Sequence, residues 1–262
     1  MKTVGIIGGG NMGSAIISRI RKNFKIQVCE QDWARGEELR KKYNVKLQSL
    51  PSLVKSSDII IVAVKPQDID SVLANMKAAG VNKKLVISIA AGIPIAFLED
   101  HLGDGARVIR TMPNMPAMIG EGMTAVAQGS NARKVDMTTA QQIFNAVGKT
   151  VVIEEKWIDA VTAVSGSGPA YVFLIAECLI KAAQSLGLQE NSSTALVKQT
   201  LLGSAYLLDG ASESPSTLRE KVTSKGGTTE AALAVFYNHN LEAIFKEALT
   251  AARDRAKELA RR

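Results

Sequence analysis

Three glycines near the N-terminus have the spacing of a phosphate-binding turn. Gly8, Gly10 and Gly13 satisfy the pattern G-x-G-x-x-G, after the apolar run TVGII and at the start of the helical pattern MGSAIISRI. The first glycine permits a tight bend, the second lets the backbone approach a pyrophosphate, and the third lets helix and strand pack closely. Unpaired N–H groups at the helix start would bind the diphosphate. We predict a dinucleotide site that includes these glycines, Asn11 and Met12.

The residue that would contact the adenine ribose is expected about 20 positions further on, at the end of the second strand. Glu30 stands there, and Arg35 follows closely. Glu30 could accept a hydrogen bond from a ribose 2′-hydroxyl, which favours NAD(H), whereas Arg35 could pair with a 2′-phosphate, which favours NADP(H). The residues leave both cofactors open.

A second glycine-containing turn, Ser224-Lys225-Gly226-Gly227-Thr228-Thr229, precedes a helical pattern in the other half of the chain. Its free backbone N–H groups would form an anion site of the same physical kind, and its glycines would admit a carboxylate close to the chain. The simpler alternative is that Thr228 and Thr229 only cap the helix.

The elements that must position these turns differ between the two halves. The first half alternates β-branched runs with helical patterns, and runs such as IIIVAV are apolar throughout, as in a parallel sheet covered on both faces. Strands are expected at 3–7, 25–30, 59–64, 85–90, 108–111, 123–128 and 150–153, and helices at 11–23, 33–43, 66–78, 94–101 and 132–147. We predict an α/β fold, with a Rossmann-type doubly wound sheet at the N-terminus.

After Glu155 only helical patterns remain, at 157–164, 169–186, 190–208, 216–223, 228–237 and 241–261. We therefore predict a dinucleotide-binding domain over 1–157 and a helical dimerisation and substrate-binding domain over 158–262. The helix that begins at Pro169 is apolar on most of its circumference, so it must be buried inside its domain or between subunits. A homodimer is the simpler packing for so short a domain.

The charge and residue composition indicates which kinds of binding partner the protein has. Lys plus Arg number 32 and Asp plus Glu 25, and residues 1–155 carry 20 basic and 14 acidic side chains, which is 6 of the 7 net positive charges. This excess would favour a phosphate-bearing cofactor. Aromatic residues are too sparse, at 5%, for a nucleic-acid stacking platform. No apolar run of about 18 residues is evident, and the two cysteines suggest neither disulfides nor a metal site. We expect a cytoplasmic protein without nucleic-acid, metal or membrane partners.

Several further motifs occur in one order along the chain. They are IGGGNMG at 7–13, AVKP at 63–66, SIAAGI at 88–93, IRTMPNMPA at 109–117, DAVTAVSGSGPAY at 159–171 and VTSKGGTTEAAL at 222–233. Together they resemble pyrroline-5-carboxylate reductase, the last enzyme of proline biosynthesis, over nearly the whole chain. The GGTT turn in a helical C-terminal half is the most specific of them.

The resemblance implies hydride transfer from NADP(H) or NAD(H) to the C=N carbon of 1-pyrroline-5-carboxylate, giving L-proline. It implies homodimers, with five dimers assembling further into a decamer. It places along the cofactor the residues Ala63, Val64, Lys65, Pro66, Ala90 and Ala91, and at the nicotinamide Met112, Pro113 and Asn114. It assigns the substrate carboxylate to Ser224, Gly226, Gly227 and Thr228, and gives Thr229 the catalytic position facing the imine nitrogen.

Two residues depart from the family pattern. Lys225 replaces the usual proline of SPGGTT, and Met115 replaces the usual threonine of PNTP. Two rival functions remain. A hydroxyacid dehydrogenase would need a lysine four residues after Gly168, where this chain has Val172. A non-catalytic dinucleotide sensor would keep the first turn but would have no reason to keep the second.

Overall fold

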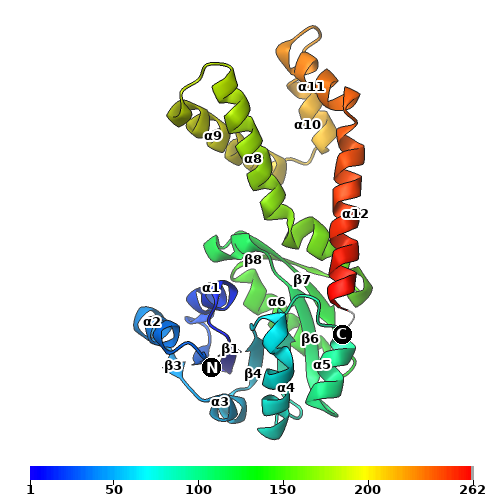
Figure 1. The fold of residues 1–262 in the computed structure, drawn as a ribbon. Coiled ribbons are helices and arrows are strands. Elements are labelled where there is room, and N and C mark those ends of the chain that lie inside the picture. Colours follow the sequence, from blue (N-terminus) through cyan, green and yellow to red (C-terminus); the bar gives the residue numbers. More distant parts are fainter. Residues whose placement is uncertain (261–262) are drawn as a thin grey trace. The chain divides into compact units, whose positions relative to one another are not determined.

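The computed structural model describes residues 1–260 and contains one eight-stranded sheet (Figure 1). The strands are β1 (Thr3–Ile7), β2 (Lys25–Cys29), β3 (Lys46–Leu47), β4 (Ile59–Val62), β5 (Leu85–Ser88), β6 (Arg107–Met112), β7 (Gly122–Gln128) and β8 (Gly148–Val152). Their order across the sheet is β3-β2-β1-β4-β5-β6-β7-β8. All neighbours pair in parallel except β6 and β7, which are antiparallel. The order of the first six strands is that of a Rossmann sheet, so the fold prediction is confirmed.

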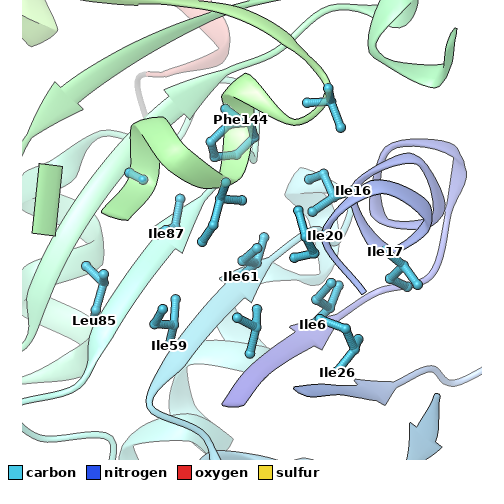
Figure 2. Packing of buried hydrophobic residues seen from close by; sticks show 14 of the residues in the cluster. Ile6, Ile16, Ile17, Ile20, Ile26, Ile59, Ile61, Leu85, Ile87 and Phe144 are labelled. Carbon is cyan, nitrogen blue, oxygen red and sulfur yellow. The ribbon is translucent and has the colours of Figure 1, made fainter. Parts of the chain in front are cut away.

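Helices cover both faces of the sheet. They are α1 (Asn11–Ile20), α2 (Trp33–Tyr43), α3 (Leu50–Ser56), α4 (Ile69–Ala78), α5 (Ile95–Leu102), α6 (Lys134–Asn145) and α7 (Ile158–Val161). One core joins α1, α2 and α6 to the sheet through Ile16, Leu39 and Phe144, and Figure 2 shows Ile16 and Phe144 in it. The other core joins α3, α4 and α5 to the sheet through Leu53, Leu73 and Leu98.

Each buried strand contributes to both cores, because successive side chains point to opposite faces. Ile59 and Ile61 of β4 belong to the first core, whereas Ile60 and Val62 belong to the second, and all four are at most 2% exposed. This two-sided burial explains the continuous apolar runs in the sequence.

The sequence patterns do not predict three short elements: the two-residue strand β3, helix α3 and a 3₁₀ turn at Met115–Ile119. The helix expected at 66–78 begins as a 3₁₀ turn, Pro66–Asp68, before α4. Prolines stand in the first turn of α3 and of both 3₁₀ segments, where the missing N–H costs nothing. Strand β4 also ends at Val62, two residues earlier than expected, so Ala63 and Val64 lie in a loop.

Between β8 and residue 260, the elements are all helical. A 3₁₀ turn (Glu155–Trp157), α7 and a π-helical segment (Thr162–Gly166) lead to α8 (Gly168–Ser185), α9 (Glu190–Gly210), α10 (Pro215–Lys221), α11 (Thr228–Asn238) and α12 (Leu241–Leu259). The predicted end of the last helix, Arg261, lies outside the described residues.

The helical run Glu155–Ser185 is long and apolar enough, by length and composition alone, to cross a membrane. The expectation that no such stretch exists was therefore wrong. Within the chain, however, α8 has no buried residue, and Phe173 and Leu174 are 59% and 58% exposed. The apolar circumference of this helix is thus not covered by its own domain.

The described chain forms two compact units. One contains residues 1–167 together with the segment from Ala251 onward, and the other contains Gly168–Thr250. The first unit holds the whole sheet, and the second holds α8 to α11 and the first part of α12.

Candidate functional site

The glycine-rich turn between β1 and α1 is built as the sequence predicts. Gly8 has φ +98°, which glycine adopts without strain, and its N–H donates to the Cys29 carbonyl at 2.9 Å. A Cβ on Gly8 would lie 2.5 Å from the Ala63 carbonyl oxygen, and one on Gly13 would overlap the Gly8 carbonyl oxygen. These two positions exclude any side chain.

Gly10 differs from those two glycines because space opens beside it. A Cβ at Gly10 would meet only the Arg35 guanidinium, 3.8 Å away. Gly10 is also the residue that caps α1, and no side chain accepts from the first N–H groups of that helix. The backbone is therefore bare where a diphosphate would bind.

A cavity of 380 Å³ lies beside this turn. It brings together seven residues expected around the cofactor, namely Gly8, Gly10, Glu30, Arg35, Ala63, Val64 and Lys65. Its position at the carboxyl ends of β1 and β4 is the point where the strand order reverses, which is where doubly wound sheets bind ligands. Asn11 lies on an adjoining cavity with Arg35, and Met12 packs against the first core.

Glu30 is fixed by the backbone around it. Its Oε2 accepts from the Gly9 N–H at 2.6 Å, and its Oε1 accepts from the Asp32 N–H at 3.0 Å. The exposed Arg35 is in the first turn of α2 and lies near Gly10. A carboxylate and a guanidinium therefore share the end of the cavity. Burial, and then the Glu30 carboxylate, raise the pKa of the Cys29 thiol, which keeps this cavity residue protonated.

The loop after β6 is held from both sides. Asn114 accepts from the Met123 N–H at 2.9 Å through Oδ1, and its Nδ2 donates to the Ser165 carbonyl at 3.2 Å. Pro113 is buried and Met112 half-buried. Neither these three residues nor Ala90 and Ala91, which follow β5, line the 380 Å³ cavity.

An ion pair that the sequence did not reveal lies beneath this loop. Arg110, with a side chain 6% exposed, donates to Glu155 Oε1 at 2.9 Å, and the same oxygen accepts from the Ile95 N–H at 2.7 Å. Asp159 approaches the guanidinium at 4.0 Å. Both acids belong to the helical run after β8, so only the fold brings them to β6. Nothing in the local sequence signals the pairing.

The second turn, Ser224–Thr229, is a tight turn stabilised by glycines. The Gly227 N–H donates to the Ser224 carbonyl at 3.0 Å, and Gly226 has φ +71°. Helix α11 then begins at Thr228, with Gly227 as its cap and no side-chain hydrogen bond to that cap. Thr228 and Thr229 therefore offer free hydroxyls and backbone N–H groups rather than acting as the cap.

Glu230, in the first turn of α11, contacts the Ser224–Thr229 turn, and the sequence reasoning passed over it. Its Oε2 accepts from the Gly226 N–H at 2.6 Å. The signal was available, because a glutamate three residues after a helix cap commonly reaches back to N–H groups before the helix. The N–H groups of Gly226 and Gly227 are thus both occupied, by Glu230 and by the Ser224 carbonyl.

The residues of the first turn fit a dinucleotide. Side chains are excluded at Gly8 and Gly13, bare N–H groups start α1, and the cavity ends at groups able to contact a ribose or its phosphate. Among residues 1–260, no group of three or more His, Cys, Asp or Glu side chains is placed to hold a metal ion.

Comparison with known proteins agrees with both halves of this description. Residues 155–259 match the family described as pyrroline-5-carboxylate reductase dimerisation, and residues 3–92 match NADP oxidoreductase, coenzyme F420-dependent. Pyrroline-5-carboxylate reductase from Synechocystis sp. is 41% identical over 265 residues, covering 99% of this chain and 98% of the relative. The chain belongs to the pyrroline-5-carboxylate reductase family. The same enzyme from Methanosarcina acetivorans is 38% identical, with 99% and 98% of the two chains covered.

Solved structures of pyrroline-5-carboxylate reductases share the fold over the full length. The Coxiella burnetii reductase has a TM-score of 0.94 at 36% identity, covering 100% of this chain and 99% of its own. The Plasmodium falciparum reductase, solved with NADP bound, has a TM-score of 0.87 at 32% identity, covering 99% and 98%. A 3-hydroxyisobutyrate dehydrogenase from Mycobacterium tuberculosis matches at a TM-score of 0.54 and 17% identity, a likeness of fold alone.

Membership of the pyrroline-5-carboxylate reductase family makes the chain an NAD(P)H-dependent oxidoreductase of proline biosynthesis. It also argues against the hydroxyacid dehydrogenase alternative, whose lysine position is Val172 here.

Proposed function

We propose that this chain reduces 1-pyrroline-5-carboxylate to L-proline, with the dinucleotide bound at the first turn and the substrate carboxylate at the second. The observation that carries this proposal is the presence of two bare helix starts, α1 and α11, in a chain of this family. Each presents backbone N–H groups to an anion. When bound, the nicotinamide supplies a hydride to the imine carbon.

For the cofactor, we propose that N–H groups of Asn11, Met12 and Gly13 hold the diphosphate while Gly8 and Gly10 leave room for it. Glu30 and Arg35 would contact the adenine ribose, and the loop Ala63–Pro66 would lie along the dinucleotide. Ala90, Ala91 and the loop Met112–Asn114 would border the nicotinamide. NADP bound to the Plasmodium falciparum relative and the family match of residues 3–92 support NADP(H), and Glu30 supports NAD(H).

For the substrate, we propose that Ser224, Gly226, Gly227 and Thr228 form the carboxylate site and that the Thr229 hydroxyl donates to the imine nitrogen. Gly226 and Gly227, whose N–H groups are already bonded, would contribute by letting the carboxylate approach the backbone. The turn itself contains no His, Asp or Glu. Its contribution is therefore the placement of the ring and of one proton donor, rather than a strong general base.

We further propose a cytoplasmic homodimer, which assembles into a decamer of five dimers, with no membrane or nucleic-acid partner. The dimerisation match over 155–259 and the uncovered apolar surface of α8 support the dimer. A partner subunit would account for the same apolarity that would otherwise suit a membrane. We also propose the division into a dinucleotide-binding domain over 1–157 and a dimerisation and substrate-binding domain over 158–262.

The assay that tests the activity follows loss of nicotinamide absorbance when the full-length protein is given pyrroline-5-carboxylate with NADH or NADPH. Turnover with at least one dinucleotide is expected. If neither is oxidised while both bind, the protein is a non-catalytic dinucleotide sensor and the proposal fails.

The role of Thr229 is tested by a pair of variants. Thr229→Ala removes the hydroxyl and is expected to lower kcat by roughly 10²-fold, the lower range for a positioned proton donor, with little change in the Kd of the dinucleotide. Thr229→Ser keeps the hydroxyl and is expected to retain most of kcat. Equal kcat values for the two variants would remove Thr229 from the mechanism.

A further inference from the structure

The ion pair between the buried Arg110 and the half-buried Glu155 connects three segments of the first compact unit. Arg110 lies in β6, four residues before Asn114. Glu155 opens the helical run that follows β8, and its Oε1 also accepts from the first N–H of α5. Helix α5 follows the loop that carries Ala90 and Ala91. Glu155 Oε1 therefore contacts β6, which leads into the Met112–Asn114 loop, and α5, which follows the loop that carries Ala90 and Ala91.

The same helical run is tied to the β6 loop a second time. Ten residues after Glu155, Ser165 accepts from the Asn114 amide through its carbonyl at 3.2 Å and its Oγ at 3.3 Å. Directly after the second tie, the Gly166 backbone faces the Met112 side chain so closely that a Cβ there would lie 2.8 Å from Met112 Cε. The run 155–166 therefore contacts β6 at Arg110 and Met112, and the start of the following loop at Asn114.

The chemistry of this pair is more demanding than a surface ion pair. Arg110 is nearly enclosed, so its charge depends on Glu155 and Asp159 for compensation. Glu155 also satisfies a helix N–H that would otherwise be unpaired. The two partners are 45 residues apart in the sequence. The pair can therefore form only when the helical run is packed against the sheet.

We propose that Arg110 and Glu155 are positioning residues of the reductase. They hold the loops after β5 and β6 at a fixed separation, so that Ala90, Ala91 and Met112–Asn114 present one preformed surface to the nicotinamide. This inference rests on the proposed function, because it takes those loops as the nicotinamide border. Neither side chain lines the cavity, so both act through the loops they support.

The kinetic test compares Arg110→Met and Glu155→Ala with a matched control, Arg107→Met. Arg107 lies at the other end of β6 and has its own buried carboxylate partner, Asp136. We expect kcat to fall about tenfold or more in the first two variants, since misplacement by an ångström can cost 10²-fold, with the dinucleotide KM changed less than threefold. Arg107→Met is expected to lower thermal stability and keep kcat within twofold.

A conservative variant and a double variant distinguish loss of loop positioning from a general loss of protein stability. Glu155→Gln keeps an acceptor for the Ile95 N–H and is expected to retain most of the kcat that Glu155→Ala loses. The double variant Arg110→Met/Glu155→Ala is expected to be no slower than the slower single variant, because one pair is broken once. Losses that multiply, or kcat values matching Arg107→Met, would overturn the proposal.

A readout independent of turnover keeps this inference distinct from the proposed function. Amide hydrogen exchange of the intact protein is expected to accelerate in 90–93 and 112–114 for both Arg110→Met and Glu155→Ala, and to stay unchanged there for Arg107→Met. If exchange in these loops does not change, the positioning role is wrong even when the enzyme is active. If it changes while the unaltered protein has no reductase activity, only the proposed function fails.

Discussion

At the scale of single residues, Glu30 is the side chain best placed to govern the choice of dinucleotide. Its carboxylate is anchored on the Gly9 and Asp32 N–H groups, and it lines the cavity with Arg35. A 2′-phosphate beside it would face like-charge repulsion, whereas a 2′-hydroxyl would find an acceptor. Arg35 would partly offset that repulsion.

Glu30→Gln removes this charge and keeps an oxygen that can accept from the Gly9 N–H. We expect the ratio of kcat/KM for NADPH to that for NADH to rise about tenfold, which corresponds to about 1.4 kcal/mol of relieved repulsion. Steady-state rates with both dinucleotides measure it. Glu37→Gln, which alters a glutamate of α2 that pairs with Arg40 and does not line the cavity, is the control. An unchanged ratio would show that Glu30 serves only to shape the turn.

Gly10 and Gly13 separate the folding role of the first turn from its binding role. A Cβ at Gly13 would overlap the Gly8 carbonyl oxygen, so Gly13→Ala is expected to destabilise the fold by about 1–3 kcal/mol. Gly10 has φ −63° and open space beside it, so Gly10→Ala is expected to fold with a near-normal Tm. Its methyl would instead fill the diphosphate position and weaken NADH binding at least tenfold. Thermal melts and fluorescence titration of NADH distinguish the two outcomes.

At the scale of elements, the sequence predicted best where one local pattern determines the structure. Helix α2 begins at Trp33 and ends at Tyr43, as expected, because Asp32 accepts from the Arg35 N–H and Asn44 closes the helix in the left-handed conformation. The elements within 44–58 were not predicted, because β3 has only two residues and α3 has only two turns. Neither is long enough to show the hydrophobic periodicity of a strand or a helix in the sequence.

The candidate site also has features that the local sequence predicts and features that only the folded structure reveals. The two glycine turns were visible because their chemistry is contiguous in the chain. The link between Arg110 and Glu155 was not, since it exists only once β6 and the run after β8 are packed together. The antiparallel pairing of β7 with β6 likewise depends on tertiary packing that a strand pattern does not encode.

The turn before α11 permits a test of the departure at Lys225. Residues 224–227 form a turn in which the third residue, Gly226, has φ +71° and the fourth donates to the first, the signature of a type II turn. Proline is favoured at the second position of such a turn, where Lys225 stands. Lys225→Pro is therefore expected to raise the free energy of unfolding by about 0.4–1 kcal/mol and to preserve kcat.

Urea unfolding and steady-state kinetics measure the two effects of Lys225→Pro. Lys225→Ala serves as the control for loss of the charge alone. A large fall in kcat in both variants would mean that the ammonium group itself contacts the substrate.

At the scale of the whole molecule, the excess of positive charge in the first half has a structural explanation. Basic residues occupy the last turns of α1, α2, α3 and α4, among them Arg19, Lys55 and Lys77. Lys84 adds to this by donating to the Lys55 and Ser57 carbonyls at the end of α3. Cations stabilise the carboxyl ends of helices. These helix ends lie at the opposite edge of the sheet from the glycine turn, so the charges there complement helix dipoles rather than a cofactor phosphate.

The apolar surface of the second unit, Gly168–Thr250, leads to a prediction about the oligomeric state of the protein. Val172, Phe173 and Leu174 of α8 are each about half exposed or more in the single chain, although they form a continuous apolar stretch. Exposed apolar area of this kind marks a protein interface. Leu174→Asp would place a charge in that interface, where burying it unpaired is costly.

We expect Leu174→Asp to convert the assembly to monomers or to raise its dissociation constant at least a hundredfold, which corresponds to about 2.7 kcal/mol or more. Sedimentation velocity over a range of concentrations measures it. Trp33→Asp, which alters a 77% exposed aromatic residue on α2 of the first unit, controls for loss of surface apolarity in general and is expected to leave the oligomer intact. If Leu174→Asp sediments as the unaltered protein does, α8 does not form the subunit interface at Leu174. A shift confined to Leu174→Asp, with NADH binding retained, would show that the exposed helix is apolar because another copy of the chain covers it.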